Sequence, residues 1–160
     1  RALVRTGSGA TPAASLRPSE LRSEPLTVRG LTVADGSALA AGSVDTEQGV
    51  RLAGSMSDYR WTINGRTYDQ TEPLTIKQGQ LGRFNISNHS MMPHPMHFHG
   101  HTFQVGDAGG RGPRKDTVLV PAMGSLAIDL QADNPGNWMV HCHNLYHAEA
   151  GMMTRLEYTA

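Results

Sequence analysis

The chain lacks the features that mark nucleic-acid-binding, membrane-spanning or disulfide-stabilised proteins. Its 160 residues include 14 Lys and Arg and 14 Asp and Glu, so no excess of positive charge indicates a nucleic-acid partner or an anionic membrane surface. No apolar run approaches the roughly 20 residues of a membrane-spanning helix. The single cysteine, Cys142, excludes an internal disulfide and leaves one free thiol to explain.

Long helical periodicity is also missing, and aromatic residues make up only 6% of the chain, whereas glycine occurs 18 times. Short alternating segments predict strands instead. They cover residues 50–56, 59–63, 66–68, 74–76, 83–87, 96–105, 116–120, 125–130, 136–141 and 153–158, with a weaker candidate at 26–33. Asn64 and Gly65 predict a hairpin turn, because both tolerate positive φ. The pattern predicts an all-β protein, a β-sandwich with Greek-key connections.

The first part of the chain has a different composition. Residues 1–5 alternate like the last strand of a preceding domain, residues 10–24 are rich in Ala, Pro, Ser and Arg, and residues 34–48 are rich in Gly, Ala and Ser. We therefore expect residues 1–48 to be the end of a preceding domain followed by a linker or irregular extension. The sandwich domain is expected over residues 49–160.

The candidate chemistry is concentrated around Cys142. In a strand, neighbouring side chains point to opposite faces, so Cys142 points one way while His141 and His143 point the other. His147 and Met152 follow a short distance along the chain. A cysteine thiolate, a histidine and a methionine are three of the four ligands of a blue-copper site, which requires a second histidine.

A second group of histidines supplies candidates for the missing ligand. His97, His99 and His101 lie two residues apart and would share one face of a strand. His94 precedes them by an odd interval and can face the other way. His94 can then join the cysteine, whereas His97 and His99 can join the two histidines that flank it. A shared metal would keep so many neighbouring imidazoles neutral and remove their mutual repulsion.

Less specific interpretations stay open for these residues. A lone strand histidine is more often structural than a ligand, and a lone cysteine is more often a small buried hydrophobe. Zinc is a formal rival because Cys and His suit it, although two His, one Cys and one Met favour copper. Met91, Met92 and Met96 are interpreted as apolar packing. His89 and His101 are left outside the ligand set, and His101 is a candidate for a hydrogen bond that supports a ligand.

The motif His-Pro-Met-His-Phe-His-Gly at residues 94–100 is paired with His-Cys-His-x₃-His-x₃-Gly-Met at residues 141–152. Together they resemble the two C-terminal copper signatures of multicopper oxidases, which include laccases and bacterial copper oxidases. Segments at 59–68, 114–117 and 133–138 also resemble the last cupredoxin domain of three-domain bacterial enzymes. The resemblance covers roughly residues 50–160 and implies a cupredoxin-like fold.

By this resemblance, His94, Cys142, His147 and Met152 would bind type 1 copper, His97 would bind type 2 copper, and His99, His141 and His143 would bind the type 3 copper pair. The implied enzyme is a laccase-like oxidoreductase. A small reducing substrate (a phenol, an aromatic amine or a metal ion) would give electrons to type 1 copper at the imidazole edges of its histidines. Cys142 and its flanking histidines would pass them to a trinuclear cluster, where dioxygen is reduced to water.

Departures from the family pattern limit what this chain is expected to do alone. The family's trinuclear cluster takes eight histidines, and the motifs above supply four. We therefore expect no oxidase activity from this chain alone, with the remaining cupredoxin domains coming from the same precursor or another chain. Some relatives carry Glu after the last type 1 histidine and Asp four residues before the first, where this chain has Ala148 and Ser90. The expected location is extracytoplasmic (periplasmic, cell-surface or secreted), with an export signal upstream of residue 1.

Other copper functions explain fewer of the residues. A mononuclear blue-copper electron-transfer protein needs only the type 1 ligands and leaves the other four motif histidines without a role. A copper nitrite reductase lacks the second histidine of the His-Cys-His motif, so His143 counts against it. A copper-storage module would rest on the methionines alone.

Overall fold

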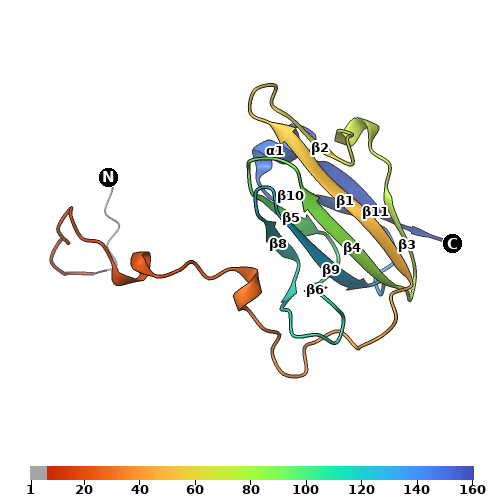
Figure 1. The fold of residues 1–160 in the computed structure, drawn as a ribbon, viewed down its shortest axis with the longest axis horizontal. Coiled ribbons are helices and arrows are strands. Elements are labelled where there is room, and N and C mark those ends of the chain that lie inside the picture. The colour runs from red at the N-terminus through yellow and green to blue at the C-terminus, as the bar shows by residue number, and fades with distance from the viewer. Residues whose placement is uncertain (1–6) are drawn as a thin grey trace.

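The computed structural model describes residues 7–160 and shows two β-sheets packed face to face (Figure 1). One sheet has the order β2 (Arg60–Ile63), β1 (Thr46–Ser55), β4 (Leu81–Asn88), β9 (Ser125–Gln131), β6 (Phe103–Val105) and β7 (Arg114–Lys115). The other has the order β3 (Leu74–Lys77), β11 (Met153–Thr159), β10 (Asn137–Cys142), β5 (His94–Phe98) and β8 (Thr117–Val120). The pairs β1–β4 and β3–β11 are parallel, and the other pairs are antiparallel.

The core between the sheets takes alternate residues from their strands. In β5, His94, Met96 and Phe98 are buried, whereas Pro95 and His97 are half-buried on the opposite face. The large buried side chains come from both sheets and from the turn before β11, and they include Trp61, Phe84, Phe98, Phe103 and Met152. A histidine in line with core residues is unusual, because burying a polar ring costs free energy unless it finds partners.

The single strand predicted over residues 96–105 is wrong, because this segment forms two strands in different sheets. Gly100 lies between them with φ +69°, a conformation that favours glycine. A Cβ at this position would overlap the ring of Trp138. The break turns His101 away from the outward-facing histidines that precede it.

The predicted hairpin turn is confirmed at Asn64 and Gly65, which have φ of +52° and +79°. An isolated bridge joins Ile63 to Arg66 across this turn. The return strand predicted at residues 66–68 is wrong beyond that bridge, because the chain continues into the 3-10 helix η3 (Tyr68–Gln70).

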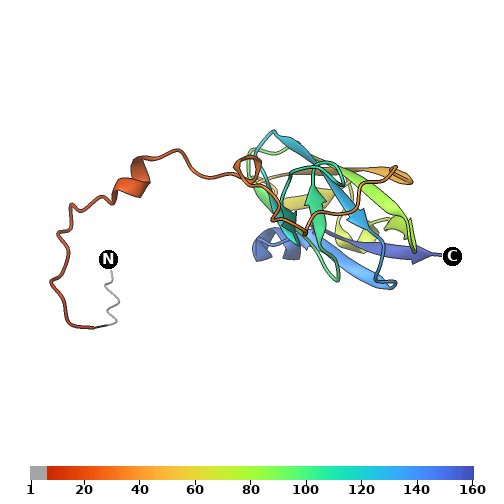
Figure 2. The ribbon, with the colours of Figure 1, turned by 90° about the horizontal axis from the view of Figure 1, so that it is seen from below.

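The extension before β1 is mostly exposed and irregular, and its first part projects away from the sandwich (Figures 1 and 2). It contains the 3-10 helices η1 (Ser19–Arg22) and η2 (Val28–Gly30), so the weak strand predicted at 26–33 is wrong. Its later part is fixed to the domain, since the N–H of Val33 donates to the carbonyl of Arg111 (2.9 Å).

Helical structure is otherwise limited in residues 7–160 to one short α-helix, α1 (Leu145–Glu149), which follows β10 at one end of the sandwich. No helix in this part of the chain is long and apolar enough to span a membrane. Residues 1–5, predicted as a strand, lie outside the described residues. Strand β1 begins at Thr46, slightly before the expected start of the domain.

Candidate metal centre

His94, Cys142 and His147 bring three ligand atoms together in the core. The Nδ1 atoms of the two histidines are 3.1 Å apart, and the Sγ of Cys142 lies 3.7 Å from Nδ1 of His94 and 3.8 Å from Nδ1 of His147. All three side chains are buried. An ion at the centre of this triangle would lie about 2 Å from each atom, the length of a metal–nitrogen bond. In the described part of the chain, no other His, Cys, Asp or Glu side chains converge as such a group.

The antiparallel pair of β5 and β10 fixes the position of the cysteine. Cys142 lies opposite Met96, and both side chains are fully buried. Asn144 then starts α1, and the N–H of His147 donates to the carbonyl of Asn144 (3.0 Å). This single helical turn brings the His147 ring back towards the thiol, which explains the interval between the two residues in the sequence.

Met152 reaches the same region from the turn between α1 and β11. Its carbonyl accepts a hydrogen bond from the N–H of Cys142 (3.1 Å), and its side chain is fully buried. Gly151 has φ +115°, and a Cβ there would lie 2.5 Å from the Thr67 side chain. The glycine therefore permits the close turn that puts Met152 beside the cysteine.

A buried polar network supports the His94 ring. The Nε2 of His94 lies 2.7 Å from Oγ of Ser90, and this Oγ lies 2.9 Å from Oδ1 of Asn88. The amide of Asn88 in turn donates to the carbonyls of Met92 (2.8 Å) and Pro121 (2.9 Å). Because the Ser90 hydroxyl donates to Asn88, its oxygen accepts the Nε2 proton, and Nδ1 keeps the lone pair that a metal requires.

An aromatic side chain covers both imidazoles. The indole of Trp61 packs on the His147 ring, with centroids 4.3 Å apart and planes at 31°. It meets the His94 ring edge-on at 5.2 Å. Sequence reasoning missed this role of Trp61. In the sequence, Trp61 is only one of the apolar positions in an alternating strand. Sequence reasoning also missed Asn88, for which the local sequence gives no signal.

Burial sets the protonation of His94, His147 and Cys142. It lowers the pKa of His94 to about 4, with a further contribution from the nearby His147. Burial also lowers the pKa of His147 and raises the pKa of the Cys142 thiol to about 11. Both imidazoles are therefore neutral at pH 7, and the thiol keeps its proton until a metal displaces it.

Four further histidines gather on the opposite face of β5 and β10. His97 lies directly across from His141, with ring centroids 5.6 Å apart. The Nε2 atoms of His99 and His141 are 3.0 Å apart, and the His143 ring lies 5.6 Å from the His97 ring. His143 is exposed and the other three are half-buried, so this face opens outward. Burial lowers the pKa of His99 and of His141.

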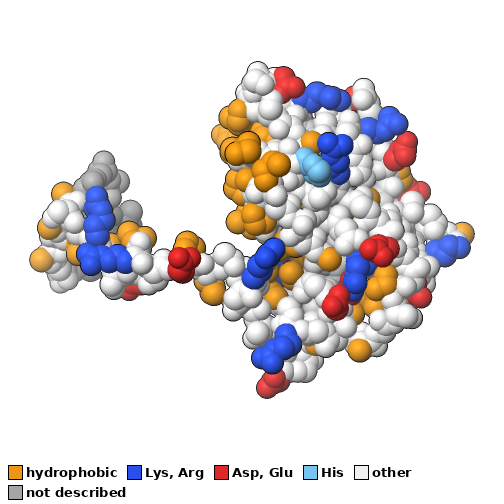
Figure 3. All heavy atoms as spheres, viewed as in Figure 1, with side chains coloured by type: hydrophobic (Ala, Val, Ile, Leu, Met, Phe, Trp, Pro, Cys, Tyr) orange, Lys and Arg blue, Asp and Glu red, His pale blue; other side chains and the backbone are white. Residues whose placement is uncertain are grey.

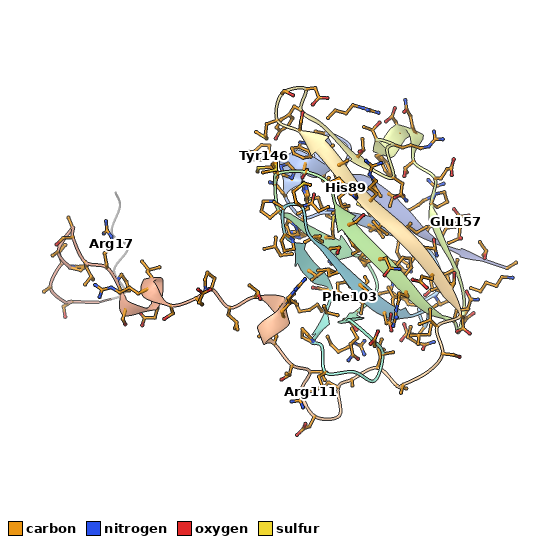
Figure 4. All side chains as sticks on the ribbon, viewed as in Figure 1. Arg17, His89, Phe103, Arg111, Tyr146 and Glu157 are labelled. Carbon is orange, nitrogen blue, oxygen red and sulfur yellow. The ribbon has the colours of Figure 1, made fainter. Side chains whose placement is uncertain are left out.

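The remaining ring nitrogens show which of these histidines have a free ligand atom. The Nδ1 of His97 lies 2.9 Å from the carbonyl of Asp116, which leaves its Nε2 free. His101 is engaged at both nitrogens, by the carbonyl of His99 (3.0 Å) and the hydroxyl of Tyr158 (2.6 Å). His89 is exposed just beyond the end of β4 (Figure 4), and its Nε2 lies 3.2 Å from Oγ of Ser87. Neither His101 nor His89 is oriented as a metal ligand.

Hydrophobic side chains collect at the end of the sandwich that carries α1 (Figure 3). Tyr146 projects there with 74% of its surface exposed (Figure 4). Met91, next to Ser90 in the sequence, is 80% exposed, so its predicted packing role is wrong. Met96 is fully buried and Met92 packs against the core, as predicted.

Comparison with known proteins places this geometry in a family. A family model for multicopper oxidases matches residues 44–160. The chain belongs to the multicopper oxidase family. It is 46% identical over 159 residues to multicopper oxidase MmcO of Mycobacterium tuberculosis, covering 99% of this chain and 32% of MmcO. It is 36% identical over 104 residues to copper resistance protein A of Escherichia coli, covering 64% of this chain and 17% of that protein.

Solved structures of multicopper oxidases share the fold. McoA from Aquifex aeolicus superimposes with a TM-score of 0.64 at 28% identity, over 78% of this chain and 32% of McoA. The blue copper oxidase from Nitrosomonas europaea gives 0.65 at 26% identity, over 72% of this chain and 44% of that enzyme. The predicted cupredoxin-like β-sandwich and the predicted family are thus confirmed. This multicopper oxidase chain spans about a third of the length of MmcO.

Proposed function

We propose that this chain is the C-terminal, electron-accepting domain of a laccase-like multicopper oxidase that uses dioxygen as electron acceptor. The observation that carries the proposal is the buried triangle of His94, Cys142 and His147, which lies directly behind an open face of four histidines. Two imidazoles and one thiolate form the donor set that suits copper of the blue type.

The proposed ligands follow from the two faces of the β5–β10 pair. His94, Cys142, His147 and Met152 hold type 1 copper, His97 holds type 2 copper, and His99, His141 and His143 hold the type 3 copper pair. When bound, copper supplies one-electron redox chemistry on the buried side and, on the open side, the centre at which dioxygen is reduced to water.

The residues of this chain link the buried triangle to the open face and hold the imidazoles of the triangle neutral and oriented. Cys142 is joined by one peptide unit to His141 and by another to His143, so a short covalent path links the buried ligands to the open face. The core around Cys142 excludes water, which keeps the ligand imidazoles neutral. Ser90 and Asn88 hold His94 with Nδ1 towards the thiol.

The open face requires further ligands, because four histidines are half of the family's set. We propose that the remaining cupredoxin domains, in the same precursor or in another chain, cover this face and complete the cluster.

We also propose that residues 1–48 combine the end of a preceding domain with a linker, that residues 49–160 are the copper domain, and that the enzyme works outside the cytoplasm. The reducing substrate is a phenol, an aromatic amine or a metal ion.

A mononuclear blue-copper electron carrier is the second candidate. The buried triangle alone supports it equally well. The close approach of His99 to His141 and the pairing of His97 with His141 favour the oxidase, because a carrier has no use for them.

Copper content with absorption and EPR spectra tests the proposal. We expect an intense blue thiolate band, lost in Cys142→Ser, and about four coppers per completed assembly. A colourless copper-loaded protein would contradict the type 1 assignment. One copper per assembly, with the blue band present, would establish the carrier instead. Oxygen consumption at enzyme-like rates by the 160-residue chain without any partner would contradict the requirement for further domains.

A further inference from the structure

The ligand imidazoles of the buried triangle have no free edge for a reductant to touch. His94 is 0% exposed and His147 is 2% exposed. The Nε2 of His94 is occupied by Ser90, and the Nε2 of His147 lies 3.3 Å from the side-chain amide of Asn144. The sequence resemblance implies that electrons enter at exposed imidazole edges. In this structure a reductant cannot reach those edges. Another group has to connect the triangle with solvent.

Trp61 is in contact with both imidazoles and is itself fully buried. Its packing on His147, at 4.3 Å between centroids, is the closest ring contact that either ligand makes. The indole Nε1 is buried and has no hydrogen-bond partner. A buried N–H without a partner costs about 1–3 kcal/mol. An apolar side chain would fill the same volume without this cost, and what distinguishes the indole is its ring contact with both imidazoles.

Tyr59 continues the series of rings to the surface. Its ring meets Trp61 edge-on, with centroids 6.4 Å apart and planes at 83°, and 42% of the residue is exposed. Its backbone has φ +49°, which is uncommon for a bulky residue. The preceding turn is fixed by hydrogen bonds from Ser55 to Asp58 (2.5 Å) and between Ser55 and Ser57 (2.8 Å). The hairpin β1–β2 therefore holds Tyr59 in place against the indole.

We propose that Tyr59 and Trp61 are the electron-uptake path of this domain: an aromatic reductant docks on the exposed ring of Tyr59, and its electron reaches His147 through Trp61. The inference rests on the proposed function, because copper at the triangle is the acceptor. Each reductant molecule loses one electron, a phenol also releases its proton to solvent, and the bound copper goes from the cupric to the cuprous state. The electron tunnels through the two rings, so neither ring is left oxidised. Aromatic reductants are favoured because aromatic pairs attract one another beyond simple burial.

Anaerobic stopped-flow bleaching of the blue band by hydroquinone tests the path in the copper-loaded protein. We expect Tyr59→Leu to lower the second-order rate constant by about three- to tenfold, the equivalent of one aromatic contact. Tyr59→Phe keeps the ring and is expected to retain the rate. Trp61→Leu is expected to slow bleaching, and Trp61→Phe to restore most of it. Absorption maximum and reduction potential in Tyr59→Leu should match the wild type, so that a slower rate cannot come from a changed driving force.

Tyr146 provides the matched control. It is a more exposed tyrosine, adjacent to His147 in the sequence, and it has no ring contact with Trp61. Tyr146→Leu should bleach at the wild-type rate. Wild-type bleaching in Tyr59→Leu, or slower bleaching in Tyr146→Leu than in Tyr59→Leu, overturns the path and leaves the blue site intact. Absence of a blue band from the wild type would instead overturn the proposed function.

Discussion

The hydroxyl of Ser90 lies 2.7 Å from Nε2 of His94, and both residues are buried. Here a neutral hydroxyl, itself bonded to Asn88, fixes the imidazole without adding a charge to the core. The ring is thereby set with Nδ1 towards Cys142.

Ser90→Ala removes this support. We expect copper affinity at the buried triangle to fall by about 10- to 100-fold, the usual effect of losing a hydrogen bond to a ligand histidine. Competition with a chelator of known affinity measures the change. Ser125→Ala, at an exposed position of β9, is the control and should leave affinity unchanged. Equal affinities for Ser90→Ala and the wild type would show that the hydroxyl does not orient the ring.

Met152→Leu tests the proposed fourth ligand. The substitution keeps the size of the buried side chain and removes its weak sulfur donor, so we expect the blue colour to remain and the reduction potential to rise. A redox titration of the blue band gives the potential. Met153→Leu, at the adjacent half-buried position, should leave it unchanged. A potential in Met152→Leu that is unchanged or lower would rule out Met152 as the axial ligand.

The copper-free domain should lose stability as the pH falls. Burial holds the pKa of His94 at about 4 in the folded chain. Below about pH 6.5 the unfolded chain therefore binds a proton at His94 that the folded chain does not bind. His94 alone then lowers the free energy of unfolding by up to about 3 kcal/mol between pH 6.5 and pH 4. Urea unfolding at several pH values measures this slope. His94→Leu should flatten it and the exposed-site control His89→Ala should not; an equal slope in His94→Leu would assign the effect to other groups.

Gly100→Ala should destabilise the domain by about 1–3 kcal/mol, because alanine tolerates positive φ poorly and its Cβ would meet the Trp138 ring. Thermal or urea unfolding measures the loss. Gly49→Ala is the control, since that exposed strand position has open space around it, and its stability should be unchanged or slightly higher. A neutral Gly100→Ala would mean that the β5–β6 break does not depend on glycine.

Much of the architecture was readable in the sequence because it depends on local patterns. Alternation gave most strands, and the two faces around Cys142 follow from the strand period. The break at Gly100 was missed because it depends on contact with Trp138, which is distant in the sequence. The roles of Trp61 and Asn88 were missed for the same reason: one packs on α1 and the other bonds to the segment after β8, and neither contact leaves a local signature.

The alternation of faces along β10 has a consequence for how this domain tolerates insertions and deletions. One residue gained or lost within the strand would move Cys142 to the solvent side and turn a neighbouring histidine into the core. The buried triangle and the open face of four histidines would then be disrupted together, and no such length change would keep one of them intact. Length changes should therefore be accepted in the exposed loops and rejected between Asn137 and Cys142, even where each individual side-chain substitution in that strand is mild.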